Sequence, residues 1–313
     1  MQVFGEIMRL TSYKVEGATR LGLVLNEMVF DLNKAYTSLF GERRVFPNDM
    51  ISLLEGGERI FLKVRELHEA LTEHDEPSKQ KGICHILRDV KILAPIPRPR
   101  KNIVCLGVNY PDHAAETKHE PPRYPIFFTK APTCVIGVGD PIVLPKCSQR
   151  IDYEVELAFI LGRKGKNIKE EEAWDYIAGY AVLNDVTARD LQRSHQQWFK
   201  GKSLDTFAPM GPCLVTPDEV DDPHNLNLRL SLNGKVMQED NTKELFFKIP
   251  EILASLSVDM TVEAGDIVAT GTPGGIGDSR SPPVYLKPGD CVRSEVEGIG
   301  VLENPVTSAA EES

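Results

Sequence analysis

Short segments in which hydrophobic and polar residues alternate dominate the chain after residue 100. Such alternation predicts β-strands, and turn pairs such as Asn233-Gly234 separate several of these segments. Helical periodicity is confined there to short runs at about 170–177, 187–199 and 248–257. The pattern therefore predicts a β-rich α+β fold, with strands at 102–108, 124–129, 133–138, 141–145, 153–162, 178–185, 226–234 and 266–271.

The first 90 or so residues have a different pattern. Short alternating runs precede a helix, which the apolar spacing predicts at about 58–72. The proline-rich segment 94–101 then favours a stiff, extended connection. We therefore predict a small N-terminal α/β domain at 1–93 and a larger domain at 94–307.

Composition narrows the class of protein. The chain has 313 residues, of which 41% are hydrophobic and 26% charged, as in soluble globular proteins. Its formal net charge of -10 argues against nucleic acid or an anionic membrane as the main partner, because both attract basic surfaces. The six cysteines are scattered and the N-terminus lacks an apolar signal-peptide core, so we expect a cytoplasmic protein.

The most unusual stretch is IDYEVELAFILGR, in which Asp152, Glu154 and Glu156 alternate with apolar residues. In a continuous strand these three carboxylates would share one face. They would repel one another unless neutralised, and the apolar run that follows places them beside dry protein. A divalent cation with oxygen ligands would resolve this conflict, whereas a solvated acidic face is the simpler alternative.

A further acid follows another apolar run, where Asp185 lies at a predicted strand-to-helix junction. We expect the helix to begin with Thr187 as its N-cap and Asp190 three residues later. Arg189 and Gln192 would then share one face beside Asp185. A turn or capping role explains Asp185 equally well at this point.

His113 and Glu116 form a second candidate group, within a short helix that Pro111 would begin. Their spacing places them on one face, and a carboxylate that orients an imidazole makes it a good general base. A chance ion pair on a solvated helix is the alternative. Pro121 and Pro122 would end the helix early and leave a short element that could act as a lid.

The glycine-rich run TGTPGGIG at 270–277 lacks the spacing of a dinucleotide-binding loop. It predicts either a plain turn or a tight loop that brings Thr272 near a ligand. The run KGKS at 200–203 is not a phosphate-binding loop, because Gln196 stands where such a loop needs its first glycine.

Taken in order, these elements resemble the fumarylacetoacetate hydrolase family over about residues 92–305. The matching motifs are GVNYxxHxxE, FxK ending at Lys130, DYExEL, NDVTARDLQ, GKSLDTFxPxGP with Lys202, TGTPxGxG and VEGIG. The resemblance implies a mixed β-roll fold, a homodimer and a Mg²⁺ or Mn²⁺ ion. The N-terminal residues resemble a smaller domain that many bacterial members carry.

The resemblance also implies a role for each motif residue. Glu154, Glu156 and Asp185 would bind the metal, and Asp152 would support them without binding it. His113 and Glu116 would activate water on the lid, and Lys202 would join the catalysis. The expected substrate contacts are Lys130, Arg189, Gln192 and Thr272.

Asn109 departs from the fumarylacetoacetases proper, which bring a fourth carboxylate to the metal from this segment. It matches instead the acylpyruvase, isomerase and oxaloacetate decarboxylase members. The expected activity is therefore cleavage of a C–C bond in a 2-oxo or 2,4-dioxo acid through a metal-stabilised enolate. The alternatives are a 5-carboxymethyl-2-hydroxymuconate-type isomerase or decarboxylase of aromatic catabolism, and a non-catalytic protein that retains the fold.

Overall fold

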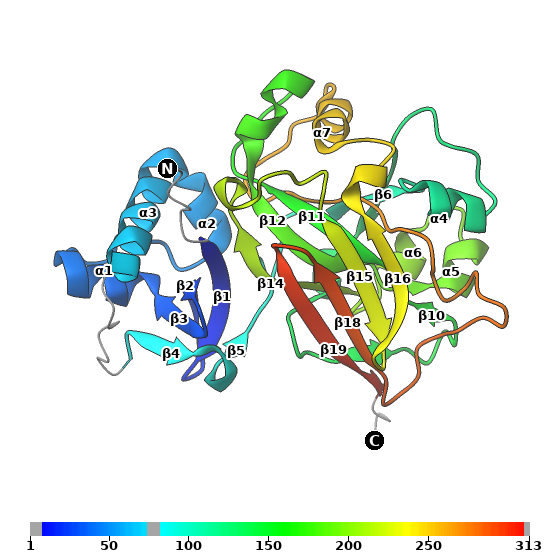
Figure 1. Cartoon of the computed structure of the whole chain (residues 1–313), viewed down its shortest axis with the longest axis horizontal. Coiled ribbons are helices and arrows are strands. Elements are labelled where there is room, and N and C mark those ends of the chain that lie inside the picture. The colour runs from blue at the N-terminus through cyan, green and yellow to red at the C-terminus, as the bar shows by residue number, and fades with distance from the viewer. Residues whose placement is uncertain (1–7, 74–81, 310–313) are drawn as a thin grey trace.

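The computed structural model describes residues 8–73 and 82–309, and Figure 1 shows the whole chain. Residues 1–7, where a signal peptide would begin, lie outside these ranges. Within them, no helix has the length and apolar character needed to cross a bilayer. The predicted β-rich α+β class is confirmed.

A twelve-stranded mixed sheet runs through the molecule (Figure 1). Its strand order is β4-β3-β2-β1-β14-β12-β11-β17-β6-β7, with β5 paired to β1 and β8 to β14, so it has two open ends and does not close into a barrel. Its strands are β1 (Arg9–Val15), β2 (Ala18–Leu25), β3 (Met28–Asp31), β4 (Cys84–Ile86), β5 (Lys91–Ile92), β6 (Ile103–Gly107), β7 (Ile126–Lys130), β8 (Val135–Ile136), β11 (Val155–Leu161), β12 (Ile177–Asn184), β14 (Ala208–Val215) and β17 (Ile267–Ala269).

A five-stranded sheet lies beside the first, in the order β16-β15-β18-β19-β9 (Figure 1). Its β15–β16 hairpin turns through Asn233 and Gly234, both at positive φ, as the sequence predicted. The strands are β9 (Ile142–Leu144), β15 (Asn227–Leu232), β16 (Lys235–Asn241), β18 (Cys291–Val296) and β19 (Gly300–Ser308), and a separate pair joins β10 (Ile151–Asp152) to β13 (Thr187–Ala188).

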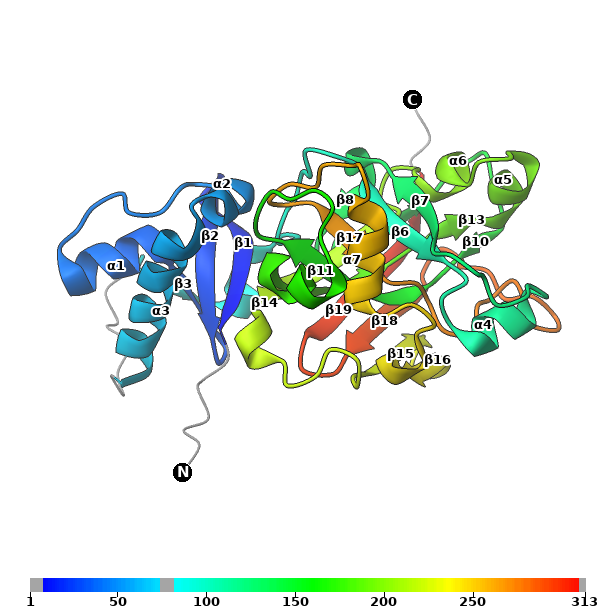
Figure 2. The ribbon, with the colours of Figure 1, turned by 90° about the horizontal axis from the view of Figure 1, so that it is seen from above.

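The helices are short, apart from one in the N-terminal part that packs near β1–β3 (Figures 1 and 2). That helix, α3, buries Ile60, Val64, Leu67 and His68 on one face, which matches the predicted helix at 58–72. The helices are α1 (Leu32–Phe40), α2 (Met50–Glu55), α3 (Gly57–Glu73), α4 (Pro111–Glu116), α5 (Arg189–Ser194), α6 (Phe199–Lys202) and α7 (Ile249–Ser257), with single 3₁₀ segments at η1 (Leu87–Asp89), η2 (Pro132–Cys134), η3 (Glu170–Tyr176), η4 (Pro217–Glu219) and η5 (Thr242–Glu244).

The N-terminal part is joined to the rest of the molecule by strand pairing. Arg9 and Leu10 of β1 pair with Val215 and Leu214 of β14. The large sheet therefore contains strands from before and after the proline-rich connection. The domain boundary at 93/94 therefore stays a prediction, although the helices α1–α3 all precede it.

Two sequence predictions need correction. The acidic stretch is two strands, not one: β10 ends at Asp152 and β11 begins at Val155, so Glu154 lies in the break between them. The predicted helix at 187–199 is instead β13, α5 and α6. Thr187 does not cap a helix, because its hydroxyl donates to the carbonyl of Asp185 and its backbone pairs with Asp152.

The central strands β11 and β12 are buried along their whole length, which explains their nearly continuous apolar sequence. Their register places Val155 opposite Asn184, so the acids near these two positions meet at one end of the sheet. On its other side β12 pairs with β14, with Tyr180 opposite Val215 and Leu183 opposite Met210.

Replacing Gly179 of β12 with Ala tests this packing. An added Cβ would lie 2.4 Å from the carbonyl oxygen of Val215 and 2.5 Å from Leu214 Cδ2. We expect Gly179→Ala to lower the free energy of unfolding by about 1–3 kcal/mol, measured by denaturant unfolding. Gly234→Asn is the control, because its hairpin tip is open and Asn tolerates positive φ. Equal midpoints for the two variants would contradict the expectation.

Candidate active site

Glu154, Glu156 and Asp185 come together as one buried group at the end of β11 and β12. Each contributes a carboxylate oxygen, and these oxygens lie within 4.8 Å of one another. The backbone enforces this proximity, since Asp185 N–H donates to the Glu154 carbonyl at 2.8 Å and Glu154 N–H to Asn184 Oδ1 at 2.9 Å. Carboxylate oxygens at this spacing form a candidate site for a divalent metal ion.

Three cationic side chains surround the acids. Lys202 Nζ lies 2.6 Å from both Glu154 Oε2 and Asp185 Oδ2. Lys130 Nζ lies 2.6 Å from Asp185 Oδ1, and Arg189 joins Glu154 Oε1 at 2.6 Å to Asp152 Oδ2 at 2.8 Å. All three cationic side chains are at most 5% exposed. With Asp152 included, four carboxylates face three cations, which leaves a formal charge of -1.

The surplus charge falls on Glu156. Its Oε2 accepts the N–H of Gly271 at 2.8 Å, and no ion pair to it is found within residues 8–73 and 82–309. Burial, then the charges of Asp185 and Glu154, raise the pKa of Glu156 well above its ordinary value. Burial also acts on Glu154, but Lys202 and Arg189 outweigh it and lower the pKa of that carboxyl to about 2. A divalent cation is the natural counter-charge for Glu156, so the donor set fits a metal.

His113 and Glu116 are paired as the sequence predicted. His113 Nδ1 lies 2.9 Å from Glu116 Oε1 on α4. The other oxygen, Oε2, accepts from Gly275 N–H at 2.9 Å and from Ser279 Oγ at 2.5 Å. Burial would raise the pKa of Glu116, but the hydrogen bonds from His113, Ser279 and Gly275 lower it overall. The ionised carboxylate therefore accepts the Nδ1 proton, which leaves Nε2 free to act as a base.

A cavity of about 630 Å³ connects these groups. Its lining includes eight of the ten residues predicted for the site: His113, Glu116, Glu154, Glu156, Arg189, Gln192, Lys202 and Thr272. Asp185 lies below the floor, bonded to Lys202. Lys130 is fully buried beneath Asp185 and does not line the cavity, so its predicted contact with substrate stays a prediction.

Thr272 and Asp152 have contacts that local patterns do not reveal. Thr272 Oγ1 donates to the Val155 carbonyl at 3.0 Å and accepts from Gln238 Nε2 at 2.8 Å. Asp152 lies outside the candidate metal group and accepts N–H donors from Gly277 and Asp278. Gln238 and Ser279 gave no signal in the sequence, because each reaches the site from a strand or loop far along the chain.

Asn109 holds the base of α4. Its Nδ2 donates to the carbonyls of Thr270 at 2.8 Å and Phe247 at 3.2 Å, and its Oδ1 accepts the N–H of Phe247 at 2.8 Å. Both polar atoms of its side chain therefore bond to backbone groups. The residue acts as a brace between α4 and the glycine-rich loop.

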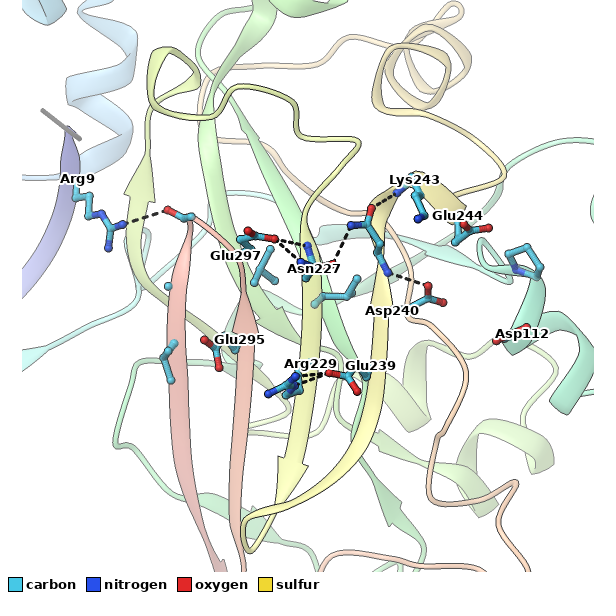
Figure 3. Close-up of a pocket in the computed structure, with 17 residues that line it drawn as sticks. Arg9, Asp112, Asn227, Arg229, Glu239, Asp240, Lys243, Glu244, Glu295 and Glu297 are labelled. Carbon is cyan, nitrogen blue, oxygen red and sulfur yellow. Dashed lines mark hydrogen bonds and ion pairs between the residues drawn. The ribbon is translucent and has the colours of Figure 1, made fainter. Parts of the chain in front are cut away.

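A larger cavity of about 880 Å³ lies across β15, β16 and β18 (Figure 3). Arg229 and Glu239 line it as an ion pair in which both side chains are more than half exposed. Asp112 of α4 stands at one edge of the groove (Figure 3). Without a buried group of acids or a base, this groove is a weaker candidate for chemistry.

Replacing Glu156 with Gln tests the charge imbalance. The pKa of Glu156 is raised in the folded protein, so the free energy of unfolding of metal-free wild type falls as the pH rises from the ordinary carboxyl pKa to the pKa of Glu156 in the folded protein. The fall is at most about 1.4 kcal/mol per pH unit. We expect Glu156→Gln to remove this loss and so to unfold at a higher temperature than metal-free wild type at pH 8. We expect Mg²⁺ or Mn²⁺ to stabilise wild type but not this variant. Calorimetry with a chelator and with metal measures both effects, and a lower melting temperature for the metal-free variant at pH 8 would contradict the imbalance.

Comparison with known proteins finds relatives that span nearly the whole chain. The family model for the fumarylacetoacetate hydrolase C-terminal region matches residues 102–307. Oxaloacetate tautomerase YisK of Bacillus subtilis (strain 168) is 41% identical over 291 residues, which cover 91% of this chain and 95% of that protein. A fumarylacetoacetate hydrolase structure from Exiguobacterium antarcticum has a TM-score of 0.78 and 35% identity, and covers 96% of this chain and 100% of its own. Maleylpyruvate hydrolase from Sphingobium sp. SYK-6, solved with manganese(II) and pyruvate, has a TM-score of 0.75 and 31% identity over 97% and 100% of the two chains.

Proposed function

The chain belongs to the fumarylacetoacetate hydrolase family, and on this premise we propose that it is a divalent-metal-dependent enzyme that forms an enolate from a 2-oxo or 2,4-dioxo acid. The observation that carries the proposal is the buried group of Glu154, Glu156 and Asp185, of which the two glutamates line the same cavity as the His113–Glu116 pair. An acidic metal site beside an oriented base suits chemistry at a carbon next to a carbonyl.

The metal we propose is Mg²⁺, with Mn²⁺ as the alternative that the Sphingobium structure supports. Bound to Glu154, Glu156 and Asp185, it would supply Lewis-acid stabilisation to an oxygen on which negative charge develops. The protein groups then divide the remaining work. Lys202 places an ammonium at the cavity floor, while Arg189, Gln192 and Thr272 line its walls and would orient the substrate.

Two reactions share the enolate, and observations favour each. In C–C cleavage, either water attacks the C4 carbonyl or CO₂ leaves, the C3–C4 bond breaks, and its electron pair becomes the enolate of pyruvate. In tautomerisation, a base removes a proton from C3 and a proton is delivered to the keto oxygen. The Sphingobium structure, named a hydrolase and containing pyruvate, favours the first. The Bacillus relative, named an oxaloacetate tautomerase, favours the second.

His113 is the residue we propose for proton transfer in both cases. Its Nε2 would take a proton from water in hydrolysis or from C3 in tautomerisation, while Glu116 keeps Nδ1 protonated. Lys130 is proposed to act from below, by fixing Asp185. A purely binding role would not need this base or the buried cations.

A panel of 2-oxo and 2,4-dioxo acids distinguishes the reactions. We expect metal-dependent conversion of oxaloacetate, seen either as loss of its enol absorbance without mass change or as pyruvate in mass spectrometry. A chelator should abolish the signal above the uncatalysed rate. The absence of any metal-dependent conversion across acylpyruvates, oxaloacetate and a hydroxymuconate-type diene would refute the proposed function.

Two substitutions separate the metal ligands from their support. Glu154→Ala should abolish metal-dependent turnover and calorimetric metal binding, because it removes a ligand and leaves Arg189 and Lys202 short of a partner. Asp152→Ala should leave metal binding measurable, because Asp152 lies outside the group of ligands. If the two variants lost metal binding equally, the ligand assignment would be wrong.

The remaining proposals concern organisation. We propose a homodimer and a cytoplasmic location for the protein, together with a catalytic unit at 94–307 that carries the whole site. All ten candidate residues lie after position 94, which supports the last of these.

A further inference from the structure

The loop that carries TGTPGGIG touches both the lid helix and the group of acids. We refer to residues 274–280 as the bridge loop. Towards α4, its Gly275 N–H and Ser279 hydroxyl both donate to Glu116 Oε2, at 2.9 and 2.5 Å. Towards the acids, its Gly277 and Asp278 N–H groups donate to Asp152 at 2.8 and 3.0 Å. The bridge loop therefore links the proposed base to the strand that leads into the metal site.

On the acid side the bridge loop is held firmly. Asp152 is fully buried and also bonds to Arg189, which continues to Glu154. Asp278 pairs with Arg193 of α5 and accepts from the Tyr285 hydroxyl at 2.7 Å. These contacts fix the position of the bridge loop independently of α4.

Its glycines allow close packing on three sides. A Cβ on Gly274 would lie 2.9 Å from Asp112 Cβ on α4, and one on Gly275, at φ +101°, would lie 2.3 Å from the Met237 carbonyl of β16. A Cβ on Gly277 would lie 1.9 Å from the Val284 carbonyl. The bridge loop therefore packs closely against α4, against β16 of the second sheet and against the chain at Val284, and only glycine leaves room for these contacts.

The lid helix is held at its two ends by different contacts. The Asn109 side chain fixes the start of α4 through hydrogen bonds to the backbone of Phe247 and Thr270. Helix α4 has six residues and ends at Glu116. The Glu116 side chain bonds this end of the helix to the bridge loop. Because such a short helix is unstable by itself, contacts at the exit decide whether His113 stays oriented.

We propose that Ser279 is a positioning residue, which acts through Glu116 to hold the exit of α4 and the His113 imidazole in place over the cavity. Ser279 donates to the oxygen of Glu116 that His113 does not use, so the two hydrogen bonds fix the carboxylate plane from both sides. The kinetic part of this inference rests on the proposed function, whereas its structural part does not.

Hydrogen exchange of the full chain without substrate tests the structural part. The change is Ser279→Ala, and Ser279→Thr is the rescue because it keeps the hydroxyl. Ser52→Ala is the matched control: its hydroxyl is also exposed and donates to a carboxylate, Asp49 Oδ2, at 2.7 Å. Ser279→Ala removes a hydrogen bond to a charged group, so amide exchange in residues 111–119 should be about tenfold faster than in wild type. Ser279→Thr and Ser52→Ala should exchange at the wild-type rate. Equal exchange in Ser279→Ala and Ser52→Ala would overturn the inference.

Steady-state kinetics on the substrate found with the panel tests the kinetic part. We expect Ser279→Ala to lower kcat about tenfold with KM and metal affinity within about twofold of wild type, and Ser279→Thr to restore kcat. A change in KM or metal affinity as large as the change in kcat would show a general structural role and overturn the inference. If wild type converts no member of the panel, the proposed function fails, while the exchange experiment still decides whether Ser279 holds the lid.

Discussion

A buried excess of negative charge at the end of β11 and β12 constrains the rest of the site. Four carboxylates share this floor with Lys130, Arg189 and Lys202, and every cation is already paired. Desolvating charges is costly unless each finds a partner, so the remaining carboxylate, Glu156, requires either a proton or a cation. The surrounding elements follow from this need. Asp152 ends β10 and Glu154 lies in the break before β11, and both bond to Arg189, while α6 brings Lys202 to Glu154 and Asp185.

The sequence predicted the parts of this arrangement that depend on neighbouring residues. The apolar runs of β11 and β12 and the acids at their ends are local features, and so is the spacing of His113 and Glu116. Alternation failed at Tyr153, because nothing in the local pattern shows that the strand breaks there. The prediction of Thr187 as a helix N-cap was wrong for a related reason, because the Thr187 backbone belongs to β13 and pairs with Asp152 of β10.

Contacts between distant segments could not be predicted in this way. Lys130 and Asp185 are 55 positions apart, and Ser279 and Glu116 are 163 apart. The motif of Lys130 indicates a site residue but not its place, and the sheet puts its side chain beneath Asp185. Only the fold shows on which side of the acids a cation lies, since the same pairing of charges is possible from above or below.

The charge of the site also explains how an acidic protein can accept an anionic substrate. The chain as a whole has a formal charge of -10, which repels a carboxylate. At moderate ionic strength, salt screens this repulsion at distances beyond about 10 Å. Lys118 lines the cavity and supplies a local positive charge, whereas Arg193 at the same cavity is already paired with Asp278. At the floor, a bound divalent cation would change the formal charge of the buried groups from -1 to +1. The carboxylates that attract the metal thus make the floor attractive to an anion only once the metal is bound, so the metal should bind before the substrate.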